Sequence, residues 1–422
     1  MKVLPNMEYL EHYKELLNNS LDNEDPYRKF KNESFEIFSK VGFPISKKRN
    51  ERWKYLDLRS LASQKYFYNQ DSNSTNLNIE SSLNKFKDSA NLIIDNGLNA
   101  TSQIPEGLEI IPSPRVNIGS VAKNNEDGFI SLNSSLFKEL IAIRVTSKYI
   151  YKNLNIFFNA QLTEGTLECP RIYLEIENGV NITLNELHSP GSADILKIPV
   201  IEIIVKENAK VSHNRILVGS ANEKNFTFTR VSQATNSYFK STTFSSSPFL
   251  ASNDIKVSLD GEGSECDLSG LYFTAGTSQF NTHVVVDHNV PNTKSNQFYK
   301  GILSDKSKAV FSGKIFVARG AQKSYATQKD LNLLMSKGAE IDTKPSLEIY
   351  ADDVECFHGA TAGHVDDSTL FYMMTRGIPK HIATQMLIRG FADEIIDEIT
   401  NENFRELAIK QTNLLLPELS FD

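Results

Sequence analysis

The chain has 422 residues, a hydrophobic fraction of 40%, a charged fraction of 23% and a net charge of −7. This composition is ordinary for a globular protein, and the length allows two or three domains or one elongated body with helical ends. The acidic balance and the lack of a concentrated Lys/Arg run argue against a general nucleic-acid binder. No apolar stretch approaches the roughly 20 residues that cross a bilayer, so no membrane span is expected.

Cysteine usage indicates the compartment. Cys169, Cys266 and Cys356 form no Cys-x-x-Cys motif and leave one cysteine unpaired in any disulfide scheme. Residues 1–6 lack the apolar segment of a secretion signal. A reducing cytoplasm is therefore the expected location.

The first part of the chain, residues 1–90, reads as a helical region with a linker. Apolar residues recur at helical spacing from Tyr9 to Leu17, and a second such pattern ends before Gly42. Trp53 is the only tryptophan, and we interpret it as a core anchor rather than a ligand platform. Residues 69–85, which are rich in Asn and Ser, are typical of a linker or a long exposed loop.

Residues 91–365 have a different pattern. Short runs rich in β-branched residues, such as Val200 to Val205, are separated by Gly, Asn, Asp and Pro, and no convincing helix interrupts them. Several runs share an order of strand, small polar turn and strand, at irregular spacing. Over roughly 200 residues, such weak internal similarity favours the stacked turns of a β-solenoid. A β-sandwich and a propeller are the competing all-β folds.

Residues 366–422 have helical patterns. Asp366 is an N-cap candidate, Gly377 ends a first helix and Pro379 begins a second, which carries an apolar stripe from Ile382 to Ile399. A solenoid needs its open ends covered to prevent edge pairing, and we expect the terminal helices to cover them. A second apolar face that binds a partner remains an open alternative.

The segment from Asp352 to Gly363 joins the β region to the C-terminal helices. If it is extended, side chains alternate between faces, and Cys356 and His358 share one face. A thiolate and an imidazole can bind a soft metal or a sulfur species, but two ligands cannot close a tetrahedral site. A metal there would need further ligands from a partner. The alternative is a small buried cysteine beside a hydrogen-bonded core histidine.

Motifs of common enzyme classes are missing. The sequence has no Walker A motif, no GxGxxG after a strand, no HExxH and no GxSxG. His283 and His288 are five residues apart and would lie on opposite faces of one strand, so we interpret both as structural or surface residues. No catalytic residue is predicted. A solenoid enzyme of the lyase or acyltransferase type would instead stack acidic and basic residues on adjacent turns.

Several segments of the second half carry a resemblance. They are Tyr299-Lys300-Gly301-Ile302-Leu303, Ala309-Val310-Phe311-Ser312-Gly313-Lys314-Ile315, Pro345-Ser346-Leu347-Glu348-Ile349, Asp352-Asp353-Val354-Glu355-Cys356-Phe357-His358-Gly359-Ala360-Thr361, and Leu370-Phe371-Tyr372 followed by Arg376-Gly377-Ile378. Near the N-terminus, Glu51-Arg52-Trp53-Lys54-Tyr55 continues the match. Together these segments resemble the SufB/SufD family of iron–sulfur cluster assembly proteins, most clearly from about residue 280 to 400.

Two positions distinguish the branches of that family. SufB-type chains carry a cysteine in a Thr-Gln-Cys-Asp segment, where this sequence has Lys329. They also read His-Glu-Ala-Thr where this sequence has Gly359 after His358. Both departures point to the SufD branch. A SufB-like scaffold that builds clusters unaided is the alternative.

The resemblance implies a mainly β fold, a right-handed parallel β-helix flanked by N-terminal and C-terminal helical domains. It implies a non-catalytic scaffold that pairs with SufB through the β-helix and contacts the SufC ATPase through residues 366–422. It also implies that Cys356 and His358 contribute ligands to a transient iron–sulfur cluster or iron shared with SufB. Whether a flavin binds, and whether the chain forms homodimers when SufB is absent, remain open.

Overall fold

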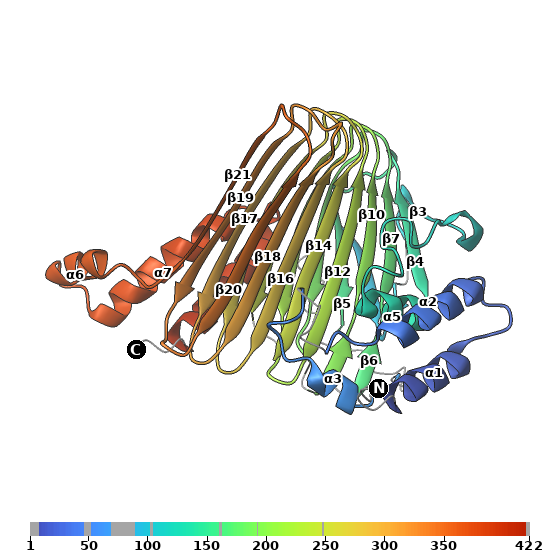
Figure 1. Ribbon diagram of the computed structural model, residues 1–422, viewed down its shortest axis with the longest axis horizontal. Helices are drawn as coiled ribbons and strands as arrows, with labels where there is room; N and C mark the ends of the chain where they lie inside the picture. Colours follow the sequence, from blue (N-terminus) through green and yellow to red (C-terminus); the bar gives the residue numbers. More distant parts are fainter. Residues whose placement is uncertain are drawn as a thin grey trace.

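A computed structural model describes residues 8–45, 52–68, 89–101, 104–159, 163–191, 193–246 and 249–418. Two large sheets face each other across a long interior, with helices outside them (Figure 1). The expected linker at 69–85 and the first six residues lie outside the described residues.

The strands form two sheets. Sheet A contains β3 (Leu108–Ile110), β4 (Leu140–Val145), β6 (Thr166–Glu168), β7 (Arg171–Ile176), β9 (Ile195–Lys197), β10 (Val200–Val205), β12 (Lys224–Gln233), β14 (Leu250–Leu259), β16 (Gln279–His288), β18 (Lys308–Val317) and β20 (Glu340–Ile349). Sheet B contains β1 (Ala90–Asp95), β2 (Leu98–Asn99), β5 (Asn153–Phe158), β8 (Asn181–His188), β11 (Lys210–Val218), β13 (Tyr238–Ser246), β15 (Glu265–Thr274), β17 (Lys294–Leu303), β19 (Tyr325–Leu334) and β21 (Glu355–Gly363).

The helices lie at the two ends of the sequence and near residue 130. They are α1 (Glu8–Ser20), α2 (Arg28–Val41), α3 (Arg59–Ser63), α5 (Gly128–Leu136), α6 (Asp367–Thr375), α7 (Lys380–Ile396) and α8 (Glu402–Leu415), with short 3-10 helices at Ser113–Arg115 and Leu416–Glu418.

From β10 onward, the chain alternates strictly between the two sheets. Each strand pairs in parallel with the strand of the same sheet in the preceding turn, as β11 pairs with β8 and β13. Asn208, Asn236 and Asp305 sit in the connecting turns with φ of 58°, 54° and 57°, a conformation that short polar side chains tolerate. The predicted fold class is confirmed: the protein is mainly β, a parallel β-solenoid with helices at both ends of the chain.

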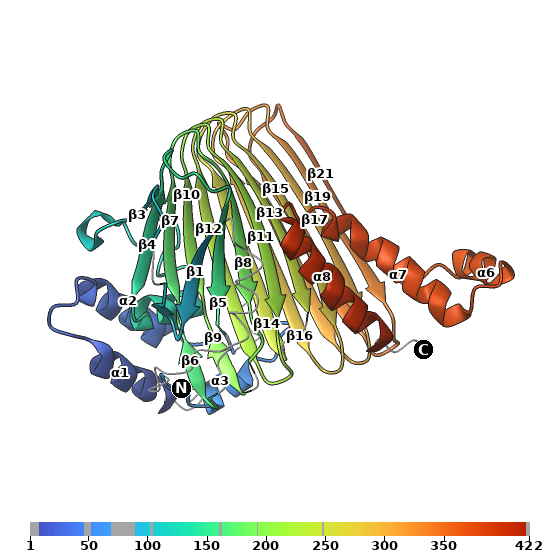
Figure 2. The ribbon, with the colours of Figure 1, turned by 180° about the vertical axis from the view of Figure 1, so that it is seen from behind.

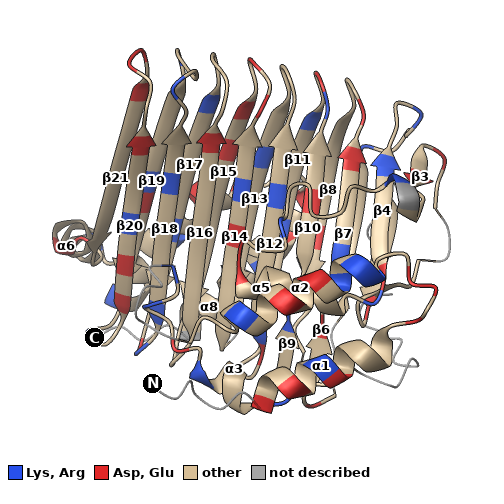
Figure 3. Cartoon of the chain, turned by 45° about the vertical axis from the view of Figure 1, so that its right-hand side comes forward, with Lys and Arg blue, Asp and Glu red and all other residues tan. Residues whose placement is uncertain are grey.

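Charged side chains of both signs are interspersed over the strands of sheet A (Figure 3). Several form ion pairs between neighbouring turns, such as Lys308 with Glu340 at 2.6 Å and Lys314 with Glu348 at 2.8 Å. Opposite charges on adjacent strands support the register of the sheet, although exposed pairs contribute little to stability.

The expectation that no helix interrupts the β region was wrong. Helix α5 lies between β3 and β4, and all of its side chains are buried. Five of its nine residues are Gly, Ser or Asn, which are typical of turns, so the sequence pattern does not indicate a helix. The Asp127 side chain caps it by accepting a hydrogen bond from the Phe129 N–H at 2.8 Å.

The expectation that terminal helices cover the solenoid ends was wrong at the C-terminal end. Helices α7 and α8 lie across the outer face of sheet B, and α6 projects away from it (Figures 1 and 2). Ile388, Ile395 and Phe404 pack with outward-facing residues of sheet B, including Phe244 and Ile302. The part of the apolar stripe from Ile388 onward therefore covers a face of sheet B, and the described helices leave the final strands uncovered.

Lys300 joins α7 to sheet B. It is buried, and its Nζ donates hydrogen bonds to the Phe391 carbonyl at 2.9 Å and to Glu394 at 2.7 Å. The next residue, Gly301, faces the interior, where a Cβ would clash with Tyr272 and Asn332. Within the Tyr-Lys-Gly segment, Lys300 therefore bonds to α7 on the outer face of β17, and Gly301 leaves room for side chains on the interior face.

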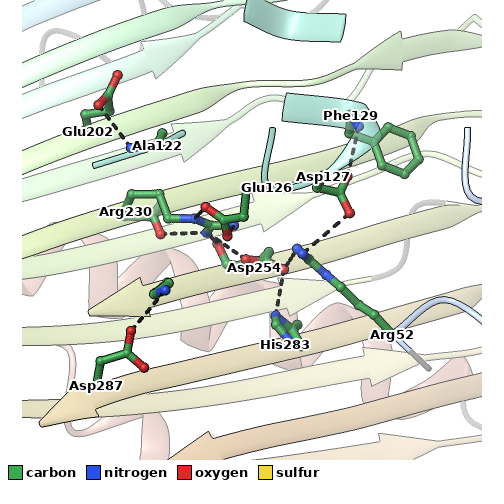
Figure 4. Close-up of polar contacts among 12 residues, drawn as sticks. Arg52, Ala122, Glu126, Asp127, Phe129, Glu202, Arg230, Asp254, His283 and Asp287 are labelled. Atoms are coloured by element: carbon green, nitrogen blue, oxygen red, sulfur yellow. Dashed lines mark hydrogen bonds and ion pairs between the residues drawn. The ribbon is translucent and has the colours of Figure 1, made fainter. Parts of the chain in front are cut away.

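A buried ion cluster attaches the N-terminal region to sheet A (Figure 4). The carboxylate of Asp254, which is fully buried, pairs with Arg52, with Arg230 at 2.6 Å and with His283 at 2.9 Å. Burial, aided by the nearby cations, holds the pKa of His283 well below its usual value, so its ring is neutral near pH 7. Asp254 is thus the shared anion of two arginines.

Trp53 follows Arg52 and strengthens this attachment. Its side chain is buried, as predicted for a core anchor, and its Nε1–H donates to Asp127 at 2.8 Å. Because Asp127 also caps α5, the Arg52–Trp53 segment, α5 and sheet A are held together by one set of polar contacts.

Asp254→Ala should destabilise the protein by about 3 kcal/mol, because it leaves two largely buried guanidinium groups without their shared carboxylate. Urea unfolding measures the change. Glu340→Ala, which breaks the exposed pair with Lys308, is the matched control and should cost less than about 1 kcal/mol. Equal losses for the two variants would contradict the anchoring role of Asp254.

Candidate functional site

The last strand of sheet B, β21, is an edge strand. It pairs in parallel with β19, and among the described residues no strand pairs with its other side. Most of its residues are exposed. The last strand of sheet A, β20, lies beside it and is also largely uncovered (Figure 1). The solenoid therefore ends in two open sheet edges.

Cys356 and His358 lie on β21 and share one face, as the alternation predicted. In the parallel register, Cys356 is opposite Ala326 and His358 is opposite Gln328. Ala326 and Gln328 are buried in the interior, so the two candidate ligands also face the interior side. Cys356 is half-buried, packed against a small apolar cluster, whereas His358 is exposed. The pair lies at the rim of the solenoid's open end.

The chemistry of this pair is incomplete. Burial raises the pKa of the Cys356 thiol above its usual value, so the free chain holds a protonated sulfur near neutral pH. Within the described ranges, no group of three or more His, Cys, Asp or Glu side chains is placed to hold a metal ion. Cys356 and His358 fit a soft metal or an iron–sulfur species as donors, but they supply only part of a coordination shell.

The two positions that separate the family branches prove to be neighbours. Lys329 on β19 is directly opposite Gly359 on β21. Both are exposed and face outward, away from the side of Cys356 and His358. A Cβ on Gly359 would meet no atom within 4 Å, so nothing in this chain prevents a side chain there. The two differences are 30 residues apart in the sequence, and the strand register brings them into one surface patch.

Asp330 lies one turn below the candidate pair and was not predicted as a site residue. It faces the interior, is fully buried and accepts a hydrogen bond from Asn332 at 2.8 Å. Burial raises the pKa of Asp330 to about 6, against the partial stabilisation from hydrogen bonds. Its position could have been inferred from alternation, because it is two residues from Gln328 on the same strand.

A second polar cluster lies deeper in the interior. The carboxylate of Glu186 contacts His188 at 2.5 Å, His213 at 2.8 Å and Arg215 at 2.9 Å. Arg215 holds the pKa of Glu186 well below its usual value despite burial, and burial lowers the pKa of both histidines. The cluster is therefore an ionised carboxylate with a guanidinium and two neutral rings, enclosed within the fold.

A cleft of about 530 Å³ lies on the outer face of sheet A. Acidic and basic residues do gather in it, as the solenoid-enzyme alternative requires. However, Arg230 pairs with Glu126 at 2.7 Å, and Lys256 pairs with Asp287 at 2.9 Å. These charges neutralise each other, so the arrangement favours a structural ion-pair network over an acid–base pair poised for catalysis.

Comparison with known proteins identifies the family. Residues 157–391, more than half of the chain, match the model described as SUF system FeS cluster assembly, SufBD core domain. The chain belongs to the SufBD family. The matched segment runs from β5 into α7 and so contains the open end with Cys356 and His358.

Individual relatives agree with this assignment. A SufBD family protein of Synechocystis is 26% identical over 380 residues, which cover 83% of each chain. The Escherichia coli protein SufD is 40% identical over 165 residues, or 39% of each chain. A chloroplast protein of Arabidopsis thaliana, ABCI7, is 30% identical over 252 residues, 58% of this chain and 53% of the relative. The chain thus spans less than two thirds of the latter two relatives.

None of the described helices combines the length and the apolar character needed to cross a bilayer.

Native alkylation should distinguish the three cysteines. Cys356 is half-buried, whereas Cys169 and Cys266 are buried, so iodoacetamide should label only Cys356 in the folded chain and all three after denaturation. The raised pKa of Cys356 should make this labelling slower than that of a free thiol. Mass spectrometry of tryptic peptides measures the sites. Native labelling of Cys169 or Cys266 at the same rate would contradict the exposure order.

Stability should depend on pH through Asp330. Because burial raises its pKa to about 6, its contribution to stability is full below the ordinary carboxyl pKa of about 4 and is lost as pH rises through 6. Asp330→Asn should therefore gain stability relative to the native chain between about pH 4 and pH 7, by up to about 3 kcal/mol. Urea unfolding at each pH measures the difference, and the exposed Asp353→Asn is the control. A difference independent of pH would contradict this account.

Proposed function

We propose that this SufBD family chain acts as a SufD-type, non-catalytic scaffold subunit that pairs with SufB through the open end of its solenoid. The observation that carries the proposal is the position of Cys356 and His358. They lie on one face of an edge strand at the end of the body, Cys356 half-buried and His358 exposed, as an incomplete ligand set. A second chain joined at this edge would complete the set.

The open end has the character of an interface. Unpaired strand edges offer N–H and C=O groups to another chain, and proteins normally protect them. Aromatic side chains also lie exposed there: Phe357 on β21 is 58% exposed, Tyr325 on β19 is 41% exposed, and their ring centroids are 6.3 Å apart. Tyr350, after β20, is 59% exposed. Unpaired backbone groups beside apolar rings favour the docking of another sheet edge.

Iron or an iron–sulfur cluster is the cargo of this proposed site. Cys356 and His358 would bind it from one side, and residues of SufB would supply the remaining ligands. Binding would displace the proton that the Cys356 thiol holds in the free chain, since a metal ligates the thiolate. No flavin is needed for this role.

We further propose the division expected from the sequence, with residues 1–90 as an N-terminal region, 91–365 as the solenoid and 366–422 as the part that contacts the SufC ATPase. The α6 helix and the beginning of α7 expose apolar side chains, including Phe371 at 67% and Met386 at 52%. Because Lys300 ties α7 to β17, movement of the helices would reach the strands near the open end. The cytoplasm is the proposed compartment.

There are two alternatives to a SufD-type subunit that pairs with SufB. A homodimer would pair β21 with the same strand of a second copy, and would place two copies of Cys356 and His358 near each other. A SufB-like scaffold that acts alone would need a full ligand set in this chain, and among the described residues no such set is present. Lys329 and Gly359 also favour the SufD branch.

Anaerobic co-expression with SufB and SufC tests the proposal. Cys356→Ser and His358→Ala should each lower the iron and sulfide that co-purify with the complex, because each removes one ligand. Both variants should still recover SufB and the ATPase in the native ratio. Iron and sulfide assays, with densitometry of the subunits, measure these results.

Cys266→Ala is the matched control, since it removes a buried thiol far along the chain from the edge strand. It should retain the native iron content. Native iron content in both Cys356→Ser and His358→Ala would reject the ligand role, and recovery of a homodimer without SufB would favour the homodimer alternative.

A further inference from the structure

We propose that Gln328 is a positioning residue for His358. When the His358 imidazole turns towards the interior, the Gln328 side-chain carbonyl, which has no partner among the described residues, accepts a hydrogen bond from one ring nitrogen and leaves the other unprotonated for the metal. The inference rests on the proposed function, because it concerns how the candidate ligand is oriented.

The strand register places the two side chains together. Gln328 on β19 is directly opposite His358 on β21, on the same face. Neighbouring strands lie about 4.8 Å apart, so a glutamine amide can reach an imidazole in the next turn. Gln328 is 1% exposed and His358 is exposed, which makes Gln328 the buried support and His358 the outer group.

Gln297 and Gln328 form a ladder of two stacked glutamines, which orients the Gln328 amide. Its Nε2 donates to Oε1 of Gln297 in the turn below at 2.6 Å, and Gln297 is its direct partner in the register. The nitrogen and the oxygen of an amide diverge from one carbon. Because the nitrogen is bonded to Gln297, the oxygen is the atom of this amide that remains for a donor from the turn that carries His358.

Gly313 holds this amide in place from the opposite sheet. It lies on β18 and faces the interior, where a Cβ would clash with Nε2 and Cδ of Gln328. A glycine within a strand often marks such a close approach. Any larger residue at position 313 would push the amide out of the ladder.

The side-chain carbonyl of Gln328 lacks the hydrogen bond that its amide nitrogen has. Its Oε1 is buried and has no hydrogen-bond partner among the described residues. A buried acceptor without a partner is destabilising, so a donor is expected nearby. His358, on the next turn, can provide an N–H. Metal-binding histidines commonly use their second ring nitrogen in such a bond, which fixes the tautomer.

Ring-nitrogen NMR of the full chain tests the hydrogen bond directly. With ¹⁵N-labelled histidine, the His358 signals are assigned by their loss in His358→Ala and recorded at about pH 8, above the ordinary histidine pKa. In the native chain, His358 should show one tautomer. Gln328→Met, which keeps the length and removes the acceptor, should give averaged shifts of two tautomers.

Two further variants separate this effect from misfolding. Gln328→Glu keeps an acceptor and should retain the single tautomer, since Gln297 has an unpartnered Nε2 that can donate to it. Gly313→Ala leaves Gln328 chemically intact but displaces its amide, and should behave like Gln328→Met. Native-like His358 shifts in both Gln328→Met and Gly313→Ala would overturn the proposal.

Metal binding separates this inference from the proposed function. Cobalt(II) is titrated anaerobically into the complex with SufB, and its thiolate absorption is followed. Gln328→Met should weaken binding by about 10- to 100-fold, as loss of such an outer hydrogen bond typically does, and Gln328→Glu should restore it. Unchanged affinity in His358→Ala would reject the ligand role. Reduced affinity in His358→Ala with native affinity in Gln328→Met would reject only the positioning role.

Discussion

The structure depends on backbone hydrogen bonds that run from each turn of the solenoid to the next. In a parallel sheet, a strand satisfies its N–H and C=O groups only through the strands beside it. Each turn therefore satisfies backbone groups of the preceding turn and needs a following turn to satisfy its own. Strand β21 has no following strand among the described strands. The same constraint that builds the body leaves an unsatisfied edge at its end. The candidate ligands lie on that edge, where another chain can meet them.

Side chains at equivalent positions of successive turns stack in the interior, and the chemical character of these stacks changes along the solenoid. In the early turns, aliphatic residues such as Ile172 and Ile201 fill the interior beside the polar cluster of Glu186. Nearer the open end, Gln328 and Asp330 occupy inward positions, and glycines make room for the polar groups. Gly301 admits the contact between Tyr272 and Asn332, which is 2.6 Å long, and Gly313 admits the Gln328 amide. Buried amides and a carboxyl with a raised pKa give this end a polar interior directly beneath Cys356 and His358.

Local patterns determined what the sequence could predict. Turn residues and β-branched runs indicated the solenoid, and a period of two placed Cys356 and His358 on one face. Helix α5 was not predicted because Gly, Ser and Asn, which are typical of turns, make up five of its nine residues. The path of α7 over sheet B depends on which apolar faces meet in space. The pairing of Arg52 with Asp254 spans 202 residues, and the contact of Gly313 with Gln328 crosses between two sheets. Such contacts depend on register between turns, which a single sequence does not encode locally.

An incomplete site has a physical consequence for the proposed assembly. In the free chain, burial raises the pKa of the Cys356 thiol and His358 is exposed, so the two supply only part of a coordination shell. Association with a partner would bury the edge, add ligands and exclude water in one event, which strengthens every electrostatic contact at the site. Metal capture would then depend on pairing, and separation of the chains would weaken all ligands together. If Gln328 orients the imidazole beforehand, the chain loses less rotational freedom when the site closes. A buried amide behind an exposed candidate ligand would thus combine an accessible site with a defined geometry.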